Sequence, residues 1–135
     1  MRYRLIGLFV FICGCANDSK IAPVVGKVTL DKVPLSNVSV VFQPIGNAEN
    51  VGPGSAGRTD QDGRFELIVV GKDDRGAVIG KHRVTVTTIM ASSNDYLVKG
   101  KEKIPRKYNT ESELSYDVPA SGFADLHIDL VTTGK

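Results

Sequence analysis

Apolar and polar residues alternate with a period of two along most of this chain. In residues 24–30, for example, Val24, Gly26 and Val28 alternate with Lys27 and Thr29. A period of two is typical of a strand that buries one face, whereas an amphipathic helix repeats about every 3.6 residues. The pattern predicts strands over residues 24–30, 38–43, 65–69, 83–88, 114–118 and 124–130, with no helix between them.

Turn-forming residues separate the expected strands. The segments 31–34 and 59–63 have turn composition, and Gly63 is free to adopt a positive φ. Pro44 ends the second strand because proline has no N–H to donate to a sheet. Residues 45–55 and 92–108 are polar and lack periodicity, so we expect two long exposed loops, where folds often place binding residues.

Together these elements predict an all-β fold, an antiparallel β-sandwich of about seven strands. The last strand is expected to turn alternate residues inward, namely Ala124, Leu126, Ile128 and Leu130. The expected core consists of Val28, Val38, Val40, Phe42, Phe65, Leu67, Val84, Val86, Leu126 and Ile128. Ten such side chains, at roughly 1.5–3 kcal/mol for each one fully buried, give a gross stabilisation of the size that a small domain requires.

The first fifteen residues have the layout of an export signal. Arg2 and Arg4 precede the apolar run 5–12, which is much shorter than the roughly 20 residues needed to cross a bilayer. Residues 12–15, Ile-Cys-Gly-Cys, resemble the lipobox of bacterial lipoproteins, with Cys15 as the residue that receives the lipid. The alternative is an ordinary secretory signal in which Cys15 stays a free thiol.

The lipobox resemblance divides the chain into three parts. Residues 1–14 would be the signal peptide, residues 15–23 a lipidated tether and residues 24–131 the folded domain. Acyl chains such as palmitate on Cys15 would anchor the protein to a membrane of the cell envelope. Ala16 follows the cysteine where aspartate is a common retention signal, which favours the outer over the inner membrane.

Net charge and cysteine content narrow the classes of function. The chain has 17 Lys and Arg residues against 15 Asp and Glu, and removal of Arg2 and Arg4 with the signal leaves 15 of each. A neutral mature chain has no overall field to attract nucleic acid, so we expect no nucleic-acid partner. Cys13 would leave with the signal and Cys15 would be acylated, so no disulfide is expected and stability must come from packing.

Four sequence blocks follow one another along the predicted domain. They are residues 26–35 (Gly-Lys-Val-Thr-Leu-Asp-Lys-Val-Pro-Leu), 38–44 (Val-Ser-Val-Val-Phe-Gln-Pro), 57–67 (Gly-Arg-Thr-Asp-Gln-Asp-Gly-Arg-Phe-Glu-Leu) and 76–86 (Gly-Ala-Val-Ile-Gly-Lys-His-Arg-Val-Thr-Val). In this order and spacing they resemble the carboxypeptidase-regulatory-like domains of small bacterial lipoproteins. The resemblance implies a transthyretin-like, Ig-like sandwich with a non-catalytic accessory, adhesive or structural role. Lys32 departs from the family, which usually has glycine there, and so does Ile79, where proline is common.

A basic segment provides the leading hypothesis for a binding site. Five cations fall within nine residues, and Tyr96 and Tyr108 flank them; the cations are Lys99, Lys101, Lys103, Arg106 and Lys107. Cations beside aromatic rings suit anionic ligands, so the segment could bind an acidic polysaccharide, lipid headgroups or another anionic envelope component. A solvated loop that also contains Glu102 is the simpler interpretation of the same residues.

Two other groups of residues suggest metals. Asp60 and Asp62 could begin a calcium loop, but the further ligands of an EF-hand are missing, so we favour a hairpin turn. His127 lies between Asp125 and Asp129 on the outer face of the last predicted strand, where a zinc or copper site would form if His82 came alongside. Alternation on a solvent-exposed strand explains the same pattern, so no metal and no cofactor is expected.

The sequence contains no motif for catalysis. Residues 54–57, Gly-Ser-Ala-Gly, lack the nucleophile elbow, and no phosphate loop, dinucleotide fingerprint or zinc-protease motif is present. We therefore expect no enzyme, but a lipid-anchored binding or structural module of the cell envelope, whose partner is an anionic glycan or an envelope protein. The alternative is a metal-dependent accessory factor or enzyme that uses Asp125, His127, Asp129 and His82.

Overall fold

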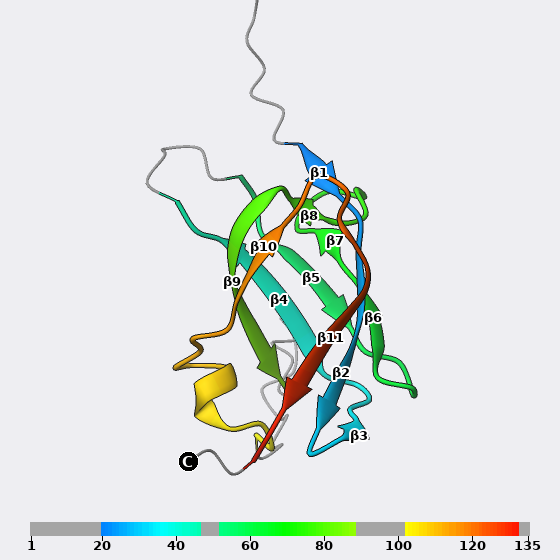
Figure 1. The fold of residues 1–135 in the computed structure, drawn as a ribbon, viewed down its shortest axis with the longest axis vertical. Helices are drawn as coiled ribbons and strands as arrows, with labels where there is room; N and C mark the ends of the chain where they lie inside the picture. Colours follow the sequence, from blue (N-terminus) through cyan, green and yellow to red (C-terminus); the bar gives the residue numbers. More distant parts are fainter. Residues whose placement is uncertain (1–19, 47–51, 89–101, 133–135) are drawn as a thin grey trace, which may run out of the picture.

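A computed structural model describes residues 20–46, 52–88 and 102–132 of the chain (Figure 1). The predicted signal peptide, Cys15, Lys99 and Lys101 lie outside these residues. Within them the fold is mostly β, as predicted, and its only helical element is the 3₁₀ turn η1 (Arg106–Tyr108). No helix among the described residues has the length and apolar character needed to cross a membrane.

The larger sheet has five strands in the order β10 (Ser115–Val118), β9 (Gly80–Thr87), β4 (Ser39–Pro44), β5 (Ser55–Arg58) and β7 (Ile68–Val69). All neighbours in it are antiparallel, as expected. The longest pairing joins β4 to β9, from Ser39 opposite Thr87 to Pro44 opposite His82. Pro44 is the last residue of β4, in agreement with its expected role as a strand terminator.

The second sheet is built around β2 (Val24–Leu30). On one side β2 pairs with β11 (Phe123–Leu130), and on the other with β3 (Val33–Pro34) and β6 (Arg64–Glu66). The pairing of β2 with β11 is parallel, so the expectation of a wholly antiparallel fold is wrong for these two strands. Both strands begin at the same end of the molecule, where the Phe123 N–H donates to the Pro23 carbonyl at 2.8 Å.

A short third sheet closes the end of the fold at which the described chain begins. There β1 (Ile21–Ala22) pairs with β8 (Ala77–Val78), and the Ile79 N–H donates to the Lys20 carbonyl at 2.9 Å. Gly76 precedes β8 with a φ of 125°, and any side chain on it would collide with the Ala22 carbonyl. Glycine is therefore required for the close approach of these two segments.

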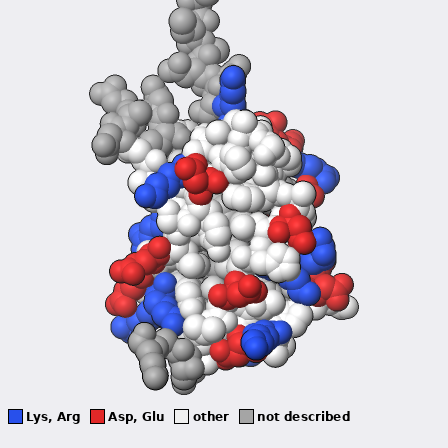
Figure 2. Space-filling model, viewed as in Figure 1, with Lys and Arg blue, Asp and Glu red and all other residues white. Residues whose placement is uncertain are grey.

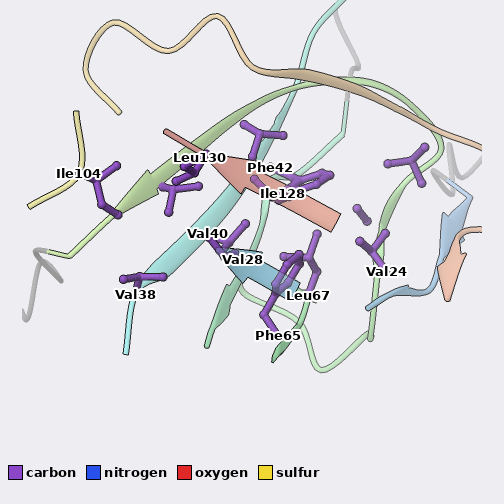
Figure 3. Packing of buried hydrophobic residues seen from close by; sticks show 14 of the residues in the cluster. Val24, Val28, Val38, Val40, Phe42, Phe65, Leu67, Ile104, Ile128 and Leu130 are labelled. Atoms are coloured by element: carbon purple, nitrogen blue, oxygen red, sulfur yellow. The ribbon is translucent and has the colours of Figure 1, made fainter. Parts of the chain in front are cut away.

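Buried side chains from both larger sheets form one hydrophobic cluster (Figure 3). Nine of the ten predicted core residues are buried, and the tenth, Leu126, is partly buried against the same cluster. Periodicity identified them because each strand buries alternate residues. The cluster also contains Ala22 and Ile104, which corrects the assignment of residue 22 to the tether and of residue 104 to an exposed loop, together with Ala77 and Val118.

Ala124 is a correction to the predicted core. It is exposed, whereas Phe123 packs partly buried against the hydrophobic cluster. The register of β11 against β2 shifts between Phe123 and Leu126, where three steps along β11 match two along β2. This bulge inserts one extra residue, so the alternation that holds from Leu126 to Leu130 does not extend back to Ala124.

The sequence pattern missed β5, and the turn that it predicted over residues 31–34 is shorter in the structure, where Val33 and Pro34 form β3. Residues 55–58 form β5, although Ser-Ala-Gly-Arg has no apolar alternation and residues 45–55 were expected to be a loop. The turn between β2 and β3 consists of Asp31 and Lys32, with φ values of 50° and 70°. Two consecutive positive φ values match the two-residue turn of a hairpin, so Lys32 adopts the backbone for which glycine is preferred.

Candidate functional site

The described part of the basic segment lies at one end of the molecule. Lys103 and Arg106 are exposed and Lys107 is partly exposed, and the last two belong to η1. In Figure 1, η1 and β3 lie at the bottom of the fold and β1 lies at the top. The cations are therefore at the end opposite to the one at which the described chain begins.

Tyr108 is part of the fold rather than a free aromatic platform. Its hydroxyl accepts a hydrogen bond from the Val131 N–H at 3.1 Å, and its ring packs against the hydrophobic cluster. The Lys107 Nζ lies 5.0 Å from the centre of the same ring, within the range of a cation–π contact. Tyr108 thus attaches η1 to the end of β11 and holds Lys107 beside it.

Glu102 is the most strongly bound carboxylate among the described residues. It accepts hydrogen bonds from the Thr87 hydroxyl at 2.6 Å, from the Thr88 hydroxyl at 2.6 Å and from the Thr88 N–H at 3.0 Å. The Ile104 N–H also donates to it at 3.0 Å. Burial raises the pKa of Glu102, but these hydrogen bonds to the charged form outweigh burial and bring the pKa to about 2.

The Glu102 carboxylate connects the chain on either side of residues 89–101, namely the end of β9 and residues 102–104. Thr87 is the last residue of β9, and Lys103 adds a hydrogen bond from its N–H to the Thr88 hydroxyl at 3.3 Å. Ile104, next in the chain, is buried in the hydrophobic cluster. The basic residues that follow are consequently attached to the end of β9, a role for Glu102 that the sequence pattern did not indicate.

A second carboxylate stabilises the same end of the fold. Asp31, in the turn between β2 and β3, accepts hydrogen bonds from the Thr132 hydroxyl at 2.7 Å and the Thr132 N–H at 3.0 Å. These bonds lower the pKa of Asp31, and the nearby charge of Lys107 acts in the same direction. The chain after β11 is thereby held against the hairpin.

His82 lies in the core of the larger sheet. It is fully buried on β9, opposite Tyr116 of β10 and Pro44 of β4, with its ring centre 5.6 Å from that of Phe42. Its Nδ1 lies 2.9 Å from the Gly80 carbonyl, while its Nε2 has no hydrogen-bond partner among the described residues. Burial lowers the pKa of His82, so the neutral ring with a proton on Nδ1 is favoured.

The residues of the alternative metal site do not lie together. His127 is exposed on β11, and its Nε2 lies 3.2 Å from an Asp125 carboxylate oxygen. Asp129 instead accepts a hydrogen bond from the Thr29 hydroxyl at 2.8 Å. His82 points into the core and does not join them. Across residues 20–46, 52–88 and 102–132, no three His, Cys, Asp or Glu side chains are grouped to hold a metal ion.

Asp60 has the geometry of a turn residue. One of its carboxylate oxygens accepts hydrogen bonds from the Asp62 N–H at 2.9 Å and from the Arg64 N–H at 3.0 Å. Gly63 has a φ of 76°, as the predicted turn requires. Residues 59–63 therefore form the predicted tight turn, whose backbone occupies this oxygen. The hairpin itself is a correction, because β5 pairs with β4 and β7 whereas β6 pairs with β2 in the other sheet.

Charged residues of both signs are mixed on one face of the molecule (Figure 2). On the face drawn in Figure 2, Lys and Arg alternate with Asp and Glu around a largely uncharged centre. Arg75, for example, is paired with Glu66 at 2.8 Å. This face has no field of one sign, so any attraction of anions has to arise locally, as at Lys103, Arg106 and Lys107.

None of the protein-family models, curated proteins or solved structures compared with the chain matches it. Functional inference therefore depends on the residues and their geometry.

Replacing Glu102 by Gln is predicted to destabilise the protein by about 1–3 kcal/mol, because an amide cannot replace a carboxylate that accepts from four donor groups. The effect would be measured as the free energy of unfolding in urea at pH 7. The pKa of Glu102 is lower in the folded than in the unfolded chain, so its contribution is complete above about pH 4.5 and is lost as the pH falls toward 2.

Glu113→Gln is a suitable control because Glu113 is exposed. An equal loss of stability in both variants would contradict the structural role of Glu102.

Because of His82, the folded protein is expected to lose stability in mild acid. The pKa of His82 is lowered from 6.5 in the folded state, so below pH 6.5 the unfolded chain binds more protons and stability falls as the pH falls. One proton gives a slope of at most about 1.4 kcal/mol per pH unit. The variant His82→Phe should flatten the stability profile between pH 6.5 and 5 relative to the unmodified chain. Parallel profiles for His82→Phe and the unmodified chain would contradict the prediction.

Proposed function

We propose that this chain is a lipid-anchored binding or structural module of the bacterial cell envelope, without catalytic activity. We further propose that its two larger sheets form a sandwich of the transthyretin-like type. The lipobox-like residues before Cys15 and the four sequence blocks support this proposal. The mostly β fold, with a single cluster of buried side chains drawn from both sheets, is compatible with it.

The observation that carries the binding proposal is the position of the basic residues. Lys103, Arg106 and Lys107 lie at the end opposite to β1 (Figure 1). A chain anchored through Cys15 would enter the domain at β1, so this end would point away from the anchoring membrane. Cations placed there can reach a ligand in the envelope space without competing with the headgroups of the anchoring membrane.

The ligand that fits this surface is a flexible anionic polymer, such as an acidic polysaccharide. Lys103 and Arg106 extend into solvent, whereas Glu102 and Asp31 use their carboxylates within the protein. Exposed cations bind polyanions mainly through charge, and such binding weakens as salt is added. An anionic patch on an envelope protein would present the same chemistry, and retention on an anionic glycan column distinguishes the two.

The alternative of a metal-dependent factor has less support. His82, which would complete the ligand set, is buried in the opposite sheet, and Asp129 accepts a hydrogen bond from Thr29. The two exposed groups that remain, His127 and Asp125, form a simple pair at 3.2 Å.

Replacing Lys103, Arg106 and Lys107 together by Ser is predicted to weaken salt-sensitive retention strongly on a heparin column, a probe for anionic glycans. The further replacement of Lys99 and Lys101 should leave no residual retention. The matched control replaces Arg64, Lys72 and Lys81, which are also exposed but lie elsewhere. Both triple variants lose the same charge, so only the first should lose retention. Equal elution of both triple variants would refute a local basic site, and retention of neither the variants nor the unmodified chain would favour a protein partner.

The anchor proposal makes a separate prediction. In a bacterial host, the mature protein should lack residues 1–14, gain the mass of a diacylglycerol and at least one acyl chain, and partition into detergent. The variant Cys15→Ser should lose all three properties. A soluble chain without added mass would contradict lipidation and leave Cys15 as an exported thiol.

A further inference from the structure

The outer edge of β11 is unpaired among the described residues. β11 forms its ladder with β2 alone, and on the other side of the strand no described strand is hydrogen bonded to it. The register is regular from Leu126 to Leu130, after the bulge. An edge strand of this kind exposes backbone groups that can pair with another strand.

The backbone direction of the β11 residues follows from two hydrogen bonds. The Leu130 carbonyl accepts from the Asp31 N–H at 2.8 Å, so Leu130 directs its backbone groups toward β2. Direction alternates along a strand, so His127 and Asp129 direct their N–H and C=O groups away from β2. The next outward group, the Val131 N–H, is already bound by the Tyr108 hydroxyl at 3.1 Å. The free edge therefore ends at Asp129.

The side chains along this edge are complementary to themselves. Asp125, His127 and Asp129 are exposed, so a histidine ring that can donate an N–H alternates with carboxylates that accept. If two copies pair antiparallel about Ile128, His127 of each copy stands opposite Asp129 of the other, and all four residues present outward backbone groups. Opposite charges directly across an antiparallel pair are stabilising, whereas like charges are destabilising.

Other registers are less favourable. Pairing about His127 would place His127 opposite itself and Asp125 opposite Asp129, so that like charges face each other. Pairing about Leu126 would use residues of the bulge, which interrupts the ladder. Lysines and other charged side chains often protect edge strands from pairing. On β11 a histidine donor alternates with carboxylate acceptors, which favours a single staggered partner.

We propose that two copies of this chain associate through their β11 strands, antiparallel and with the two-fold axis at Ile128. This inference is independent of the glycan site, which lies on η1 and the residues before it. The regular segment 126–130 provides the ladder, and the two His127–Asp129 pairs determine its register.

Disulfide trapping tests the proposed register. In a hydrogen-bonded antiparallel pair, opposite Cα atoms lie about 5.5 Å apart, within the range that a disulfide spans. Full-length chains with Cys13→Ser and Cys15→Ser would carry either His127→Cys or Asp129→Cys, and the two would be mixed and oxidised. One His127–Asp129 pair remains intact in the mixed dimer. A covalent dimer is expected from the mixture and from neither variant alone.

Charge reversal tests the same interface without cysteines. The unmodified chain should have the mass of a dimer by light scattering, and His127→Asp should convert it to a monomer at the same concentration. The control Gln43→Glu adds negative charge at an exposed position on β4 and should leave the dimer intact. In the disulfide experiment, a covalent dimer formed by the His127→Cys variant alone would refute this register. A monomeric unmodified chain, or a dimer that persists in His127→Asp, would overturn the proposal.

Discussion

The parallel pairing of β2 with β11 is the constraint on which the rest of the structure depends. It joins the first long strand of the domain to the last, and the Thr29–Asp129 hydrogen bond spans 100 residues of sequence. Closing a loop of this length costs entropy, and no disulfide within the described residues offsets that cost. The burial of Val24, Val28, Ile128 and Leu130 along this pair has to supply the stabilisation instead.

The same pairing positions the basic residues. The end of β11 provides the Val131 N–H that holds Tyr108, and the turn after β2 provides the Asp31 carboxylate that holds Thr132. Glu102 attaches the preceding residues to the end of β9. The cations of η1 are therefore placed by contacts to three elements that are distant in sequence, which gives a short polar segment a defined location.

The buried polar groups of the fold divide into two kinds. Glu102 is satisfied by several donors and remains charged, so it stabilises the folded state at neutral pH. Within residues 20–46, 52–88 and 102–132, neither the Nε2 of His82 nor the buried hydroxyl of Ser55 has a hydrogen-bond partner. An unsatisfied buried polar atom costs free energy, so these two positions lower the stability that the apolar core provides. Burial also lowers the pKa of His82, which couples stability to pH near neutrality.

Sequence periodicity was sufficient for the strands whose alternate residues are strongly apolar. Val38, Val40 and Phe42 were assigned to one buried face by their spacing alone, and Gly63 to a turn by its conformational freedom. β5 was missed because its small residues have no alternation, and its pairing is determined by β4. Local propensity is a weak guide where cross-strand partners decide the structure.

The sequence by itself determined the mostly β character, most of the core and the turn at residues 59–63, because these depend on interactions between near neighbours. Only the tertiary structure decided that β2 and β11 are parallel, that a bulge turns Ala124 outward and that His82 is buried. It also decided that Glu102 binds the Thr87 and Thr88 hydroxyls. Each of these depends on which distant strand lies alongside, and a one-dimensional pattern of polarity does not contain that information.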